Sequence, residues 1–242
     1  MKLLHDGATR RGLLHGLPIA LGYLSVSFGF GISASLGGLS PLAATLISLT
    51  NLTSAGQVAG LAIILSAGPL LEMAITQLVI NIRYFLMSLS LSQRLDGSFT
   101  LRHRLLAAFG ITDEIFGVAA SQKDPLTPRY MYGLMLLPIL GWTLGTLLGA
   151  VAGNILPDGI KHALGIAIYG MFVAIVVPPA RTERGVLVGV TVAVAISCLL
   201  SYLPLFSFIT SGFSIILSAA VAATVAALLF PIPDEGEKEE TV

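Results

Sequence analysis

Long stretches of this chain carry no charged side chain. From Gly12 to Leu71 there are 60 residues without an Asp, Glu, Lys or Arg, and from Gly185 to Pro233 there are 49. Soluble domains carry about 25% charged residues, whereas this chain is 11% charged and 55% hydrophobic. So few polar groups cannot cover a soluble globule, and the sequence predicts an integral membrane protein.

The apolar runs are long enough for spanning helices, each of which needs about 20 residues. They do not show the two-residue alternation that is typical of a membrane β-barrel. We therefore predict an all-α integral membrane protein. Its six expected spanning helices are 14–36, 70–92, 131–153, 160–178, 185–203 and 211–231.

Lysine and arginine indicate the orientation, because they are enriched in cytoplasmic loops. With both termini cytoplasmic, 11 of the 13 basic residues lie on the cytoplasmic side, and the exceptions are Lys161 and Arg83. We expect residues 1–11 to form a cytoplasmic N-terminus and 12–231 a single transmembrane transporter domain. Residues 232–242 are acidic and predict a disordered cytoplasmic tail.

Two apolar segments, 42–66 and 105–121, do not fit that count. The first has a polar, glycine-containing centre at 51–57, and the second carries Asp113 and Glu114 between two basic loops. We predict that both are broken or re-entrant, the first from the outside and the second from the inside. Irregular backbone at membrane depth is tolerated where it is buried or lines a cavity, and in transporters it often builds the substrate site.

The polar centre of the first broken segment predicts substrate binding. Free backbone N–H groups at a helix N-terminus attract anions, and polar side chains nearby can add donors. The four candidates are Asn51, Thr53, Ser54 and Gln57. The alternative is a polar kink that neighbouring helices satisfy internally.

A polar face on the span 70–92 predicts further substrate contacts, from Gln77 and Asn81, which share this face with Tyr84. Arg83 lies on a second face, well inside the helix. It either snorkels towards lipid phosphates, or forms an ion pair with a carboxylate of the protein or of a substrate.

Asp113 and Glu114 are candidates for proton coupling, because ionisable residues in apolar segments are costly and often functional. The alternative is structural: Thr112 would cap a helix that begins at Asp113, and acidic residues in a first turn suit the helix dipole. Neighbouring residues of a helix point about 100° apart, so the two carboxylates need not share one role.

Glycines at every fourth position predict tight helix packing, either within the bundle or against a partner. They are Gly141, Gly145, Gly149 and Gly153.

The sequence lacks H-E-x-x-H, G-x-S-x-G, a P-loop and any metal-type cluster of His, Cys and Asp. The single cysteine, Cys198, excludes a disulfide framework, and the zero net charge argues against nucleic-acid binding. We therefore expect a protein that is not an enzyme and that needs no cofactor or metal.

Three stretches resemble the AzlC family, the large subunits of branched-chain amino acid exporters, and the resemblance extends over about 12–231. The stretches are SPLAATLISLTNLTSAGQVAGLAIILSAG, QLVINIRYFLMSLSLS and FGITDEIFGVA. The order and spacing of N-I-R-Y at 81–84 and T-D-E-x-F at 112–116 make the resemblance specific. Family members often read A-G-A-S-Q-F at the polar break, where this chain has S-A-G-Q-V at 54–58.

The resemblance implies a secondary transporter that exports hydrophobic amino acids such as valine, leucine, isoleucine or methionine. It also implies a bacterial-type cytoplasmic membrane and a small hydrophobic AzlD-type partner subunit. The absence of a nucleotide-binding motif favours transport driven by an ion gradient. Two alternatives stay open: a passive channel for small solutes, and a membrane scaffold for the partner that does not itself transport.

Overall fold

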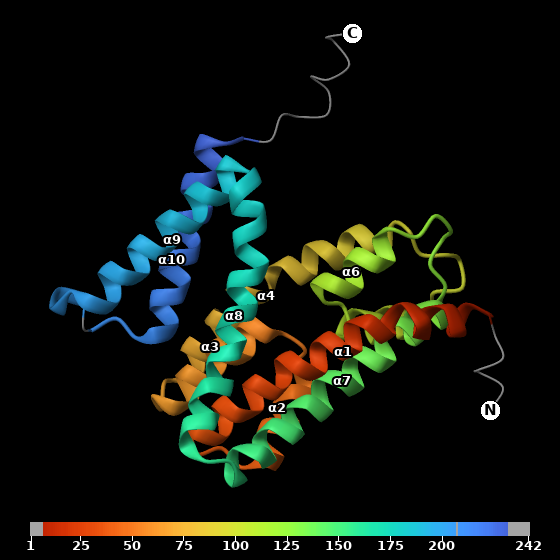
Figure 1. Cartoon of the computed structure of the whole chain (residues 1–242). Helices are drawn as coiled ribbons and strands as arrows, with labels where there is room; N and C mark the ends of the chain where they lie inside the picture. The colour runs from red at the N-terminus through yellow and green to blue at the C-terminus, as the bar shows by residue number, and fades with distance from the viewer. Residues whose placement is uncertain (1–6, 207, 232–242) are drawn as a thin grey trace. The chain divides into compact units, whose positions relative to one another are not determined.

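The computed structural model describes residues 7–206 and 208–231, and these residues are helical almost throughout (Figure 1). They contain no strand, only an isolated bridge between Leu95 and Leu126. The all-α prediction is confirmed. The predicted tail 232–242 and the first six residues of the predicted N-terminus lie outside the described residues. The helices are α1 (Gly7–Leu36), α2 (Pro41–Thr50), α3 (Ser54–Leu65), α4 (Leu70–Ser92), α5 (Leu101–Phe109), α6 (Asp113–Ala120), α7 (Pro128–Ile155), α8 (Asp158–Thr182), α9 (Arg184–Tyr202), a short 3-10 turn (Pro204–Phe206) and α10 (Ser211–Leu229).

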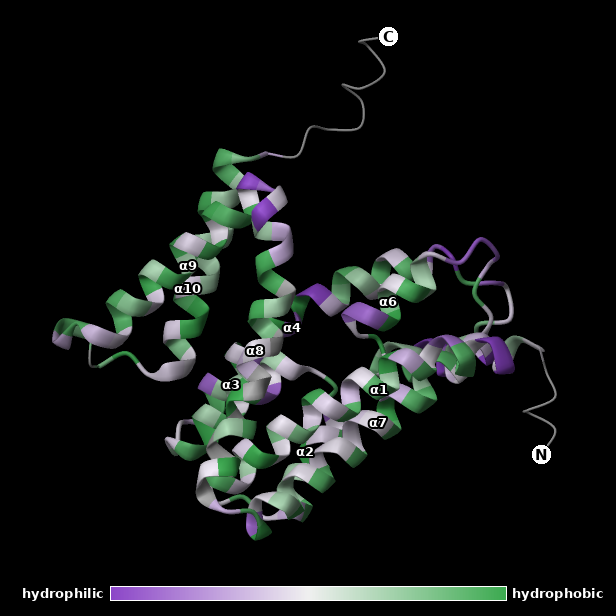
Figure 2. Cartoon of the chain, in the orientation of Figure 1, coloured by the Kyte–Doolittle hydropathy of each residue, from purple (hydrophilic) through white to green (hydrophobic). Residues whose placement is uncertain are grey.

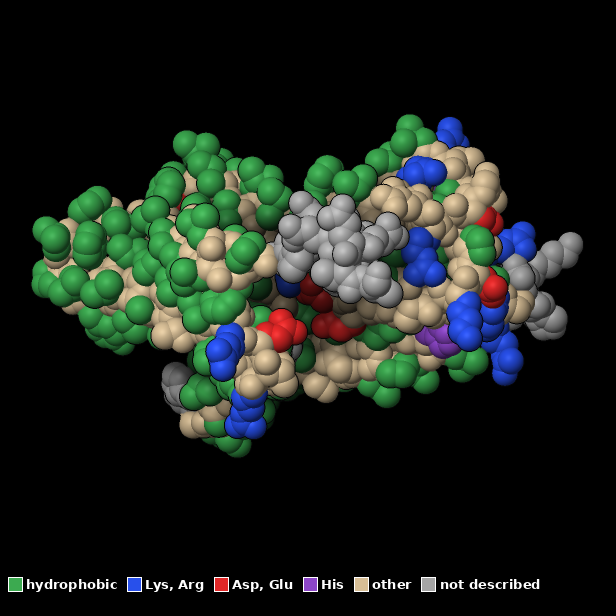
Figure 3. All heavy atoms as spheres, turned by 90° about the horizontal axis from the view of Figure 1, so that it is seen from above, with side chains coloured by type: hydrophobic (Ala, Val, Ile, Leu, Met, Phe, Trp, Pro, Cys, Tyr) green, Lys and Arg blue, Asp and Glu red, His purple; other side chains and the backbone are tan. Residues whose placement is uncertain are grey.

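Within the described residues, five helices are long and apolar enough to cross a membrane: α1, α4, α7, α9 and α10. They coincide with five of the six predicted spans. The sixth, 160–178, falls inside α8, several of whose side chains lie outside the described part of the chain. Hydrophobic residues occur along the length of these helices (Figure 2), and many hydrophobic side chains lie on the face drawn in Figure 3, as contact with lipid requires.

Each predicted broken segment is a pair of short helices. α2 and α3 have 10 and 12 residues and separate at 51–53, while α5 and α6 have 9 and 8 residues and separate at 110–112. A helix rises 1.5 Å per residue, so none of the four alone spans a hydrocarbon core of about 30 Å. Both breaks fall at or beside the polar centres that the sequence indicated. Whether either segment crosses stays a prediction.

The chain divides into two compact units. The first runs up to Leu61 and resumes over Gln77–Tyr169, and the second takes Ala62–Thr76 and the chain from Gly170 onward. The division falls inside α3, α4 and α8. A single transmembrane domain over 12–231 stays a prediction.

In the first unit, α1 and α7 pack closely and run parallel. Gly12 of α1 lies against the backbone at Tyr130, near the start of α7, and Ser35 at the other end of α1 lies against Gly153. All four glycines of the predicted packing face point at α1: an added Cβ would collide with Ala20, Leu24, Phe28 and Ser35 in turn. Small residues let two helix backbones approach this closely.

A hydrophobic core anchors α6 to the start of α7. Ile115 and Ala119 of α6 are fully buried in one cluster with Met131 and Leu134. At the other end of α6, the Arg94 guanidinium donates hydrogen bonds to the carbonyls of Ala120 and Gln122. This anchoring fixes the position of the first turn of α6, which carries the two carboxylates.

In the second unit, α9 and α10 pack against each other through small residues. A Cβ at Gly189 would lie 3.5 Å from Ala226, and one at Gly185 would lie 3.4 Å from Phe230, both ordinary packing distances. None of the residues of α9 is buried. Its apolar surface is therefore open to lipid or to another protein.

Candidate functional site

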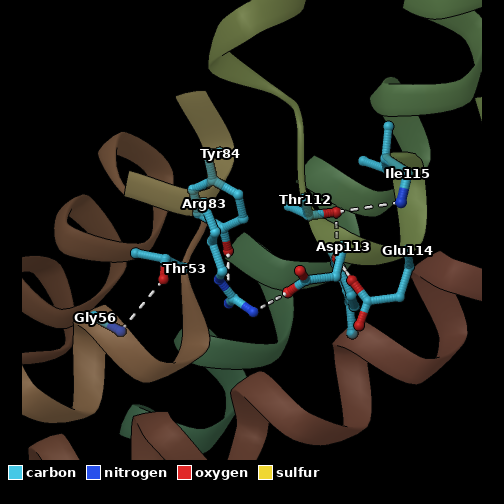
Figure 4. A network of polar contacts seen from close by, with 9 residues as sticks. Thr53, Gly56, Arg83, Tyr84, Thr112, Asp113, Glu114 and Ile115 are labelled. Atoms are coloured by element: carbon cyan, nitrogen blue, oxygen red, sulfur yellow. Dashed lines mark hydrogen bonds and ion pairs between the residues drawn. The ribbon is translucent and has the colours of Figure 1, made fainter. Parts of the chain in front are cut away.

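Arg83 is the centre of a polar network in the first unit (Figure 4). Its Nη1 lies 2.8 Å from the Asp113 carboxylate, and its Nη2 donates to the Tyr84 hydroxyl at 3.3 Å. The guanidinium also lies over the Tyr84 ring, 5.0 Å from the ring centre, in a cation–π contact. Of the partners expected for Arg83, the structure thus shows a carboxylate of the second broken segment.

Asp113 and Glu114 have separate partners, as their different directions on the helix allow. Asp113 pairs with Arg83, and Glu114 accepts a hydrogen bond from the Tyr23 hydroxyl of α1. Thr112 is the N-cap of α6: its hydroxyl accepts the N–H of Ile115 at 3.4 Å and lies 2.6 Å from the Tyr23 hydroxyl. The helix cap that the structural alternative predicts is therefore present. It does not account for the ion pair between Asp113 and Arg83.

The Arg83–Asp113 pair is only partly enclosed by the chain, with side-chain exposures of 42% and 40%. Burial raises the pKa of the Asp113 carboxyl, the Arg83 guanidinium opposes that rise, and the nearby Glu114 carboxylate adds to it. A proton and Arg83 therefore compete for the same carboxylate. Any ligand that draws Arg83 away favours protonation of Asp113.

The break between α2 and α3 is largely satisfied by the chain itself. The Thr53 hydroxyl accepts the N–H of Gly56 at 3.2 Å, as in an N-cap. The buried Gln57 amide donates to the carbonyl of Asn51, and its oxygen accepts the Ser48 hydroxyl at 3.2 Å. Thr53 and Gln57 thus support the internally satisfied kink, while Ser54 is half-buried at the first turn of α3.

The predicted polar face of α4 meets α3 at Gly56. The Gln77 amide donates to the Gly56 carbonyl at 2.7 Å, and the Asn81 amide donates to the Gln77 side-chain oxygen at 3.0 Å. A Cβ at Gly56 would lie 2.6 Å from that same oxygen. A larger residue at position 56 would therefore displace the Gln77 side chain, whose oxygen holds the Asn81 amide.

In the part of α4 that belongs to the first unit, two buried polar atoms have no hydrogen-bond partner within the described residues: Oδ1 of Asn81 and Nε of Arg83. An unpaired buried polar atom costs about 1–3 kcal/mol, so both atoms are suited to a ligand. The first is an acceptor that fits an ammonium, and the second is a donor that fits a carboxylate.

Three further polar residues join this region. Tyr23 was described above, and the buried hydroxyls of Ser48 in α2 and Thr146 in α7 lie 2.6 Å apart. Our sequence reasoning missed all three, because single hydroxyls in apolar spans are common and form no motif. The available signal was that each places a hydroxyl in an otherwise apolar run.

A family model described as "AzlC protein" matches residues 18–156, more than half of the chain. The chain belongs to the AzlC family. The matched range contains every residue of the network described above, together with the α7 glycines, and it ends before α8.

Relatives of this AzlC chain are membrane proteins. An uncharacterized membrane protein of Archaeoglobus fulgidus is 33% identical over 190 residues, which cover 77% of this chain and 83% of the archaeal protein. The inner membrane protein YgaZ of Escherichia coli is 26% identical over 231 residues, 93% of each chain. No solved structure matches. The expected family and the membrane-protein class are confirmed.

Proposed function

We propose that this AzlC-family protein is a secondary transporter. It exports branched-chain or other hydrophobic amino acids, namely valine, leucine, isoleucine and methionine, across the cytoplasmic membrane. The observation that carries the proposal is the Arg83–Asp113 pair beside the unpartnered Asn81 oxygen, in a chain otherwise poor in charge. Ionisable groups in such helices are functional candidates by default. The expected site residues Asn51, Thr53, Ser54, Gln57, Gln77, Asn81 and Arg83 stay in this proposal.

Exchange of partners at Arg83 supplies a mechanism. The carboxylate of an arriving amino acid takes hydrogen bonds from Arg83, and a bidentate contact suits a guanidinium. Asp113 then loses the cation that lowers its pKa and takes up a proton. Substrate binding and proton uptake are thereby linked, and each favours the other, so this exchange moves an amino acid and a proton in the same direction. Glu114, held by Tyr23, is the second coupling candidate.

The ammonium end of the substrate would meet Asn81. Its Oδ1 is a free acceptor within the described residues, and the side chain is held in place by its bond to Gln77. We propose that the half-buried Ser54 adds a donor near the N-terminus of α3. Thr53 and Gln57 hold the shape of the break, since their hydrogen bonds are used within the chain.

We also propose that a small hydrophobic AzlD-type subunit is needed for activity. The apolar, unburied surface of α9 offers such a partner an area to cover. Transport of this kind involves no covalent chemistry, so neither an enzymatic activity nor a cofactor belongs to the proposal.

Amino acid efflux tests the proposal. Cells that lack their own exporters are loaded with leucine- or valine-containing dipeptides and express this chain alone, with its small partner, or neither. We expect saturable efflux only when both subunits are present. Absence of efflux with both subunits in the membrane would contradict the proposal, and non-saturating flux would indicate a channel.

A further inference from the structure

Glu72 of α4, in the second unit, is a buried carboxylate that the mechanism above does not use. Its side chain is 1% exposed. Oε1 accepts the Thr210 hydroxyl at 2.5 Å and the N–H of Gly212 at 2.7 Å. Oε2 has no hydrogen-bond partner within the described residues. Oε1 therefore accepts two hydrogen bonds, whereas Oε2 accepts none within the described residues.

Within the described residues, no counter-charge pairs with this carboxylate. Glu72 belongs to neither Arg11–Asp124 nor Arg83–Asp113, the ion pairs that join two described residues. The described contacts of the carboxylate are with α3 and its following turn and with α10 and its preceding loop, which contain no titratable side chain. A buried charge without a partner is strongly unfavourable.

Other features favour the ionised form. Glu72 lies in the first turn of α4, and the N–H that it accepts belongs to the first turn of α10. Helix N-termini carry partial positive charge, and hydrogen bonds to a carboxylate stabilise its charge. Burial without a counter-charge thus disfavours the ionised form of Glu72, while the helix N-termini and the two hydrogen bonds favour it.

Neighbouring residues pack tightly around the Glu72 carboxylate. A Cβ at Gly212 would lie 2.5 Å from Oε1 and 2.8 Å from the Thr76 hydroxyl, and one at Gly68 would lie 3.2 Å from Oε2. The Thr76 hydroxyl also has no partner within the described residues. Glu72 and Thr76 are four residues apart on α4, so both unpartnered groups belong to the same face of the helix.

We propose that Glu72 is a proton-binding site of the second unit, separate from Asp113 and Glu114. Oε2 takes up one proton, which converts the carboxylate to a neutral acid, and releases it again, while Oε1 keeps both hydrogen bonds. The structural alternative is that Glu72 only caps α10. A glutamine would serve equally as a cap but could not carry the proton, so Glu72→Gln separates the two roles.

Infrared spectroscopy of the purified protein in lipid tests the site without reference to transport. We expect a carboxylic-acid C=O band that appears and disappears with pH, is absent in Glu72→Gln, and persists in the matched control Glu114→Gln. A pH-dependent band that is unchanged by Glu72→Gln, or no such band in the wild-type protein, would overturn the proposal.

A second measurement does not depend on folding of a variant. Dicyclohexylcarbodiimide reacts with protonated carboxyl groups in apolar surroundings, and mass spectrometry locates the product. We expect modification of wild-type Glu72 that declines as pH rises. Modification of Asp113 or Glu114 but never of Glu72 would contradict the proposal.

The role of this proton in coupling rests on the proposed exporter function. In proteoliposomes, we expect Glu72→Gln to retain exchange of labelled leucine and to lose accumulation driven by a pH gradient. Equal pH-driven accumulation by wild type and variant, or coupling to Na⁺ at constant pH, would overturn the coupling role. If wild-type protein shows no exchange, the exporter function fails while the infrared result still decides the proton site.

Discussion

At the scale of single residues, Arg83 has more than one partner. It lies on Tyr84, pairs with Asp113 and retains an unpaired Nε. An unpaired buried donor lowers the stability of a protein by about 1–3 kcal/mol. A purely structural role for Arg83 does not account for that cost. Arg83 thus has the properties of a group that passes from a protein carboxylate to a substrate carboxylate.

Exchanging the two charges separates a structural pair from a binding one. We expect Arg83→Asp and Asp113→Arg each to lower efflux by at least about tenfold, the equivalent of about 1.4 kcal/mol. The double exchange should restore protein levels but not efflux, because a substrate carboxylate then meets an aspartate on α4.

The matched control is another ion pair of the same unit. Arg11 and Asp124 are 3.9 Å apart and largely exposed, so Arg11→Gln should leave efflux unchanged. Restoration of wild-type efflux by the double exchange would show that the pair is structural only.

The sequence predicted the residues of this site better than their contacts. Arg83, Asp113 and Asn81 were identifiable because charged or amide groups are rare in apolar helices. The role of Tyr23 was not, because a tyrosine in an apolar span is unremarkable until the fold brings it to Glu114. Nor could the sequence show that Gln57 would turn back to Asn51 instead of facing a substrate.

At the scale of elements, the parallel packing of α1 and α7 restricts the topology. Two parallel spans require an odd number of crossings between them, and α4 supplies one. Either both broken segments cross or neither does. Sequence reasoning located both breaks, because polar residues interrupt the apolar pattern there, but it could not pair α1 with α7.

Cysteine labelling tests the interpretation that neither segment crosses. In a Cys198→Ala background, we expect a cysteine at Ser66 to react only from the outside and one at Gln122 only from the cytoplasm. Both positions lie just beyond the ends of broken segments, after α3 and α6 respectively. Labelling of Ser66 from the cytoplasm would contradict the predicted topology.

Helix packing provides another test, with the same substitution at two sites. Gly149→Ala should destabilise the protein by about 1–3 kcal/mol, because the new methyl would overlap the backbone of Phe28. Gly22→Ala, where an added Cβ meets nothing within 4 Å, should be neutral or slightly stabilising. Thermal unfolding in detergent measures both, and equal effects would contradict the close α1–α7 contact.

At the scale of the whole molecule, the chain divides its acidic groups between two units. The first holds the Arg83 network and lies mostly within the range of the AzlC family model, while the second holds Glu72. Hydropathy alone predicted the membrane class and the span positions. The division into units depends on long-range packing, which no local pattern encodes.

The central claim is that this site recognises both charged ends of an amino acid. The most direct measurement is competition against exchange of labelled leucine in proteoliposomes that contain the chain and its partner. The competitors are leucine, leucinamide without the carboxylate, and 4-methylpentanoate without the ammonium. We predict that only leucine competes effectively, because Arg83 needs the carboxylate of the substrate and Asn81 needs its ammonium group. Competition by either analogue as strong as that by leucine would contradict the account.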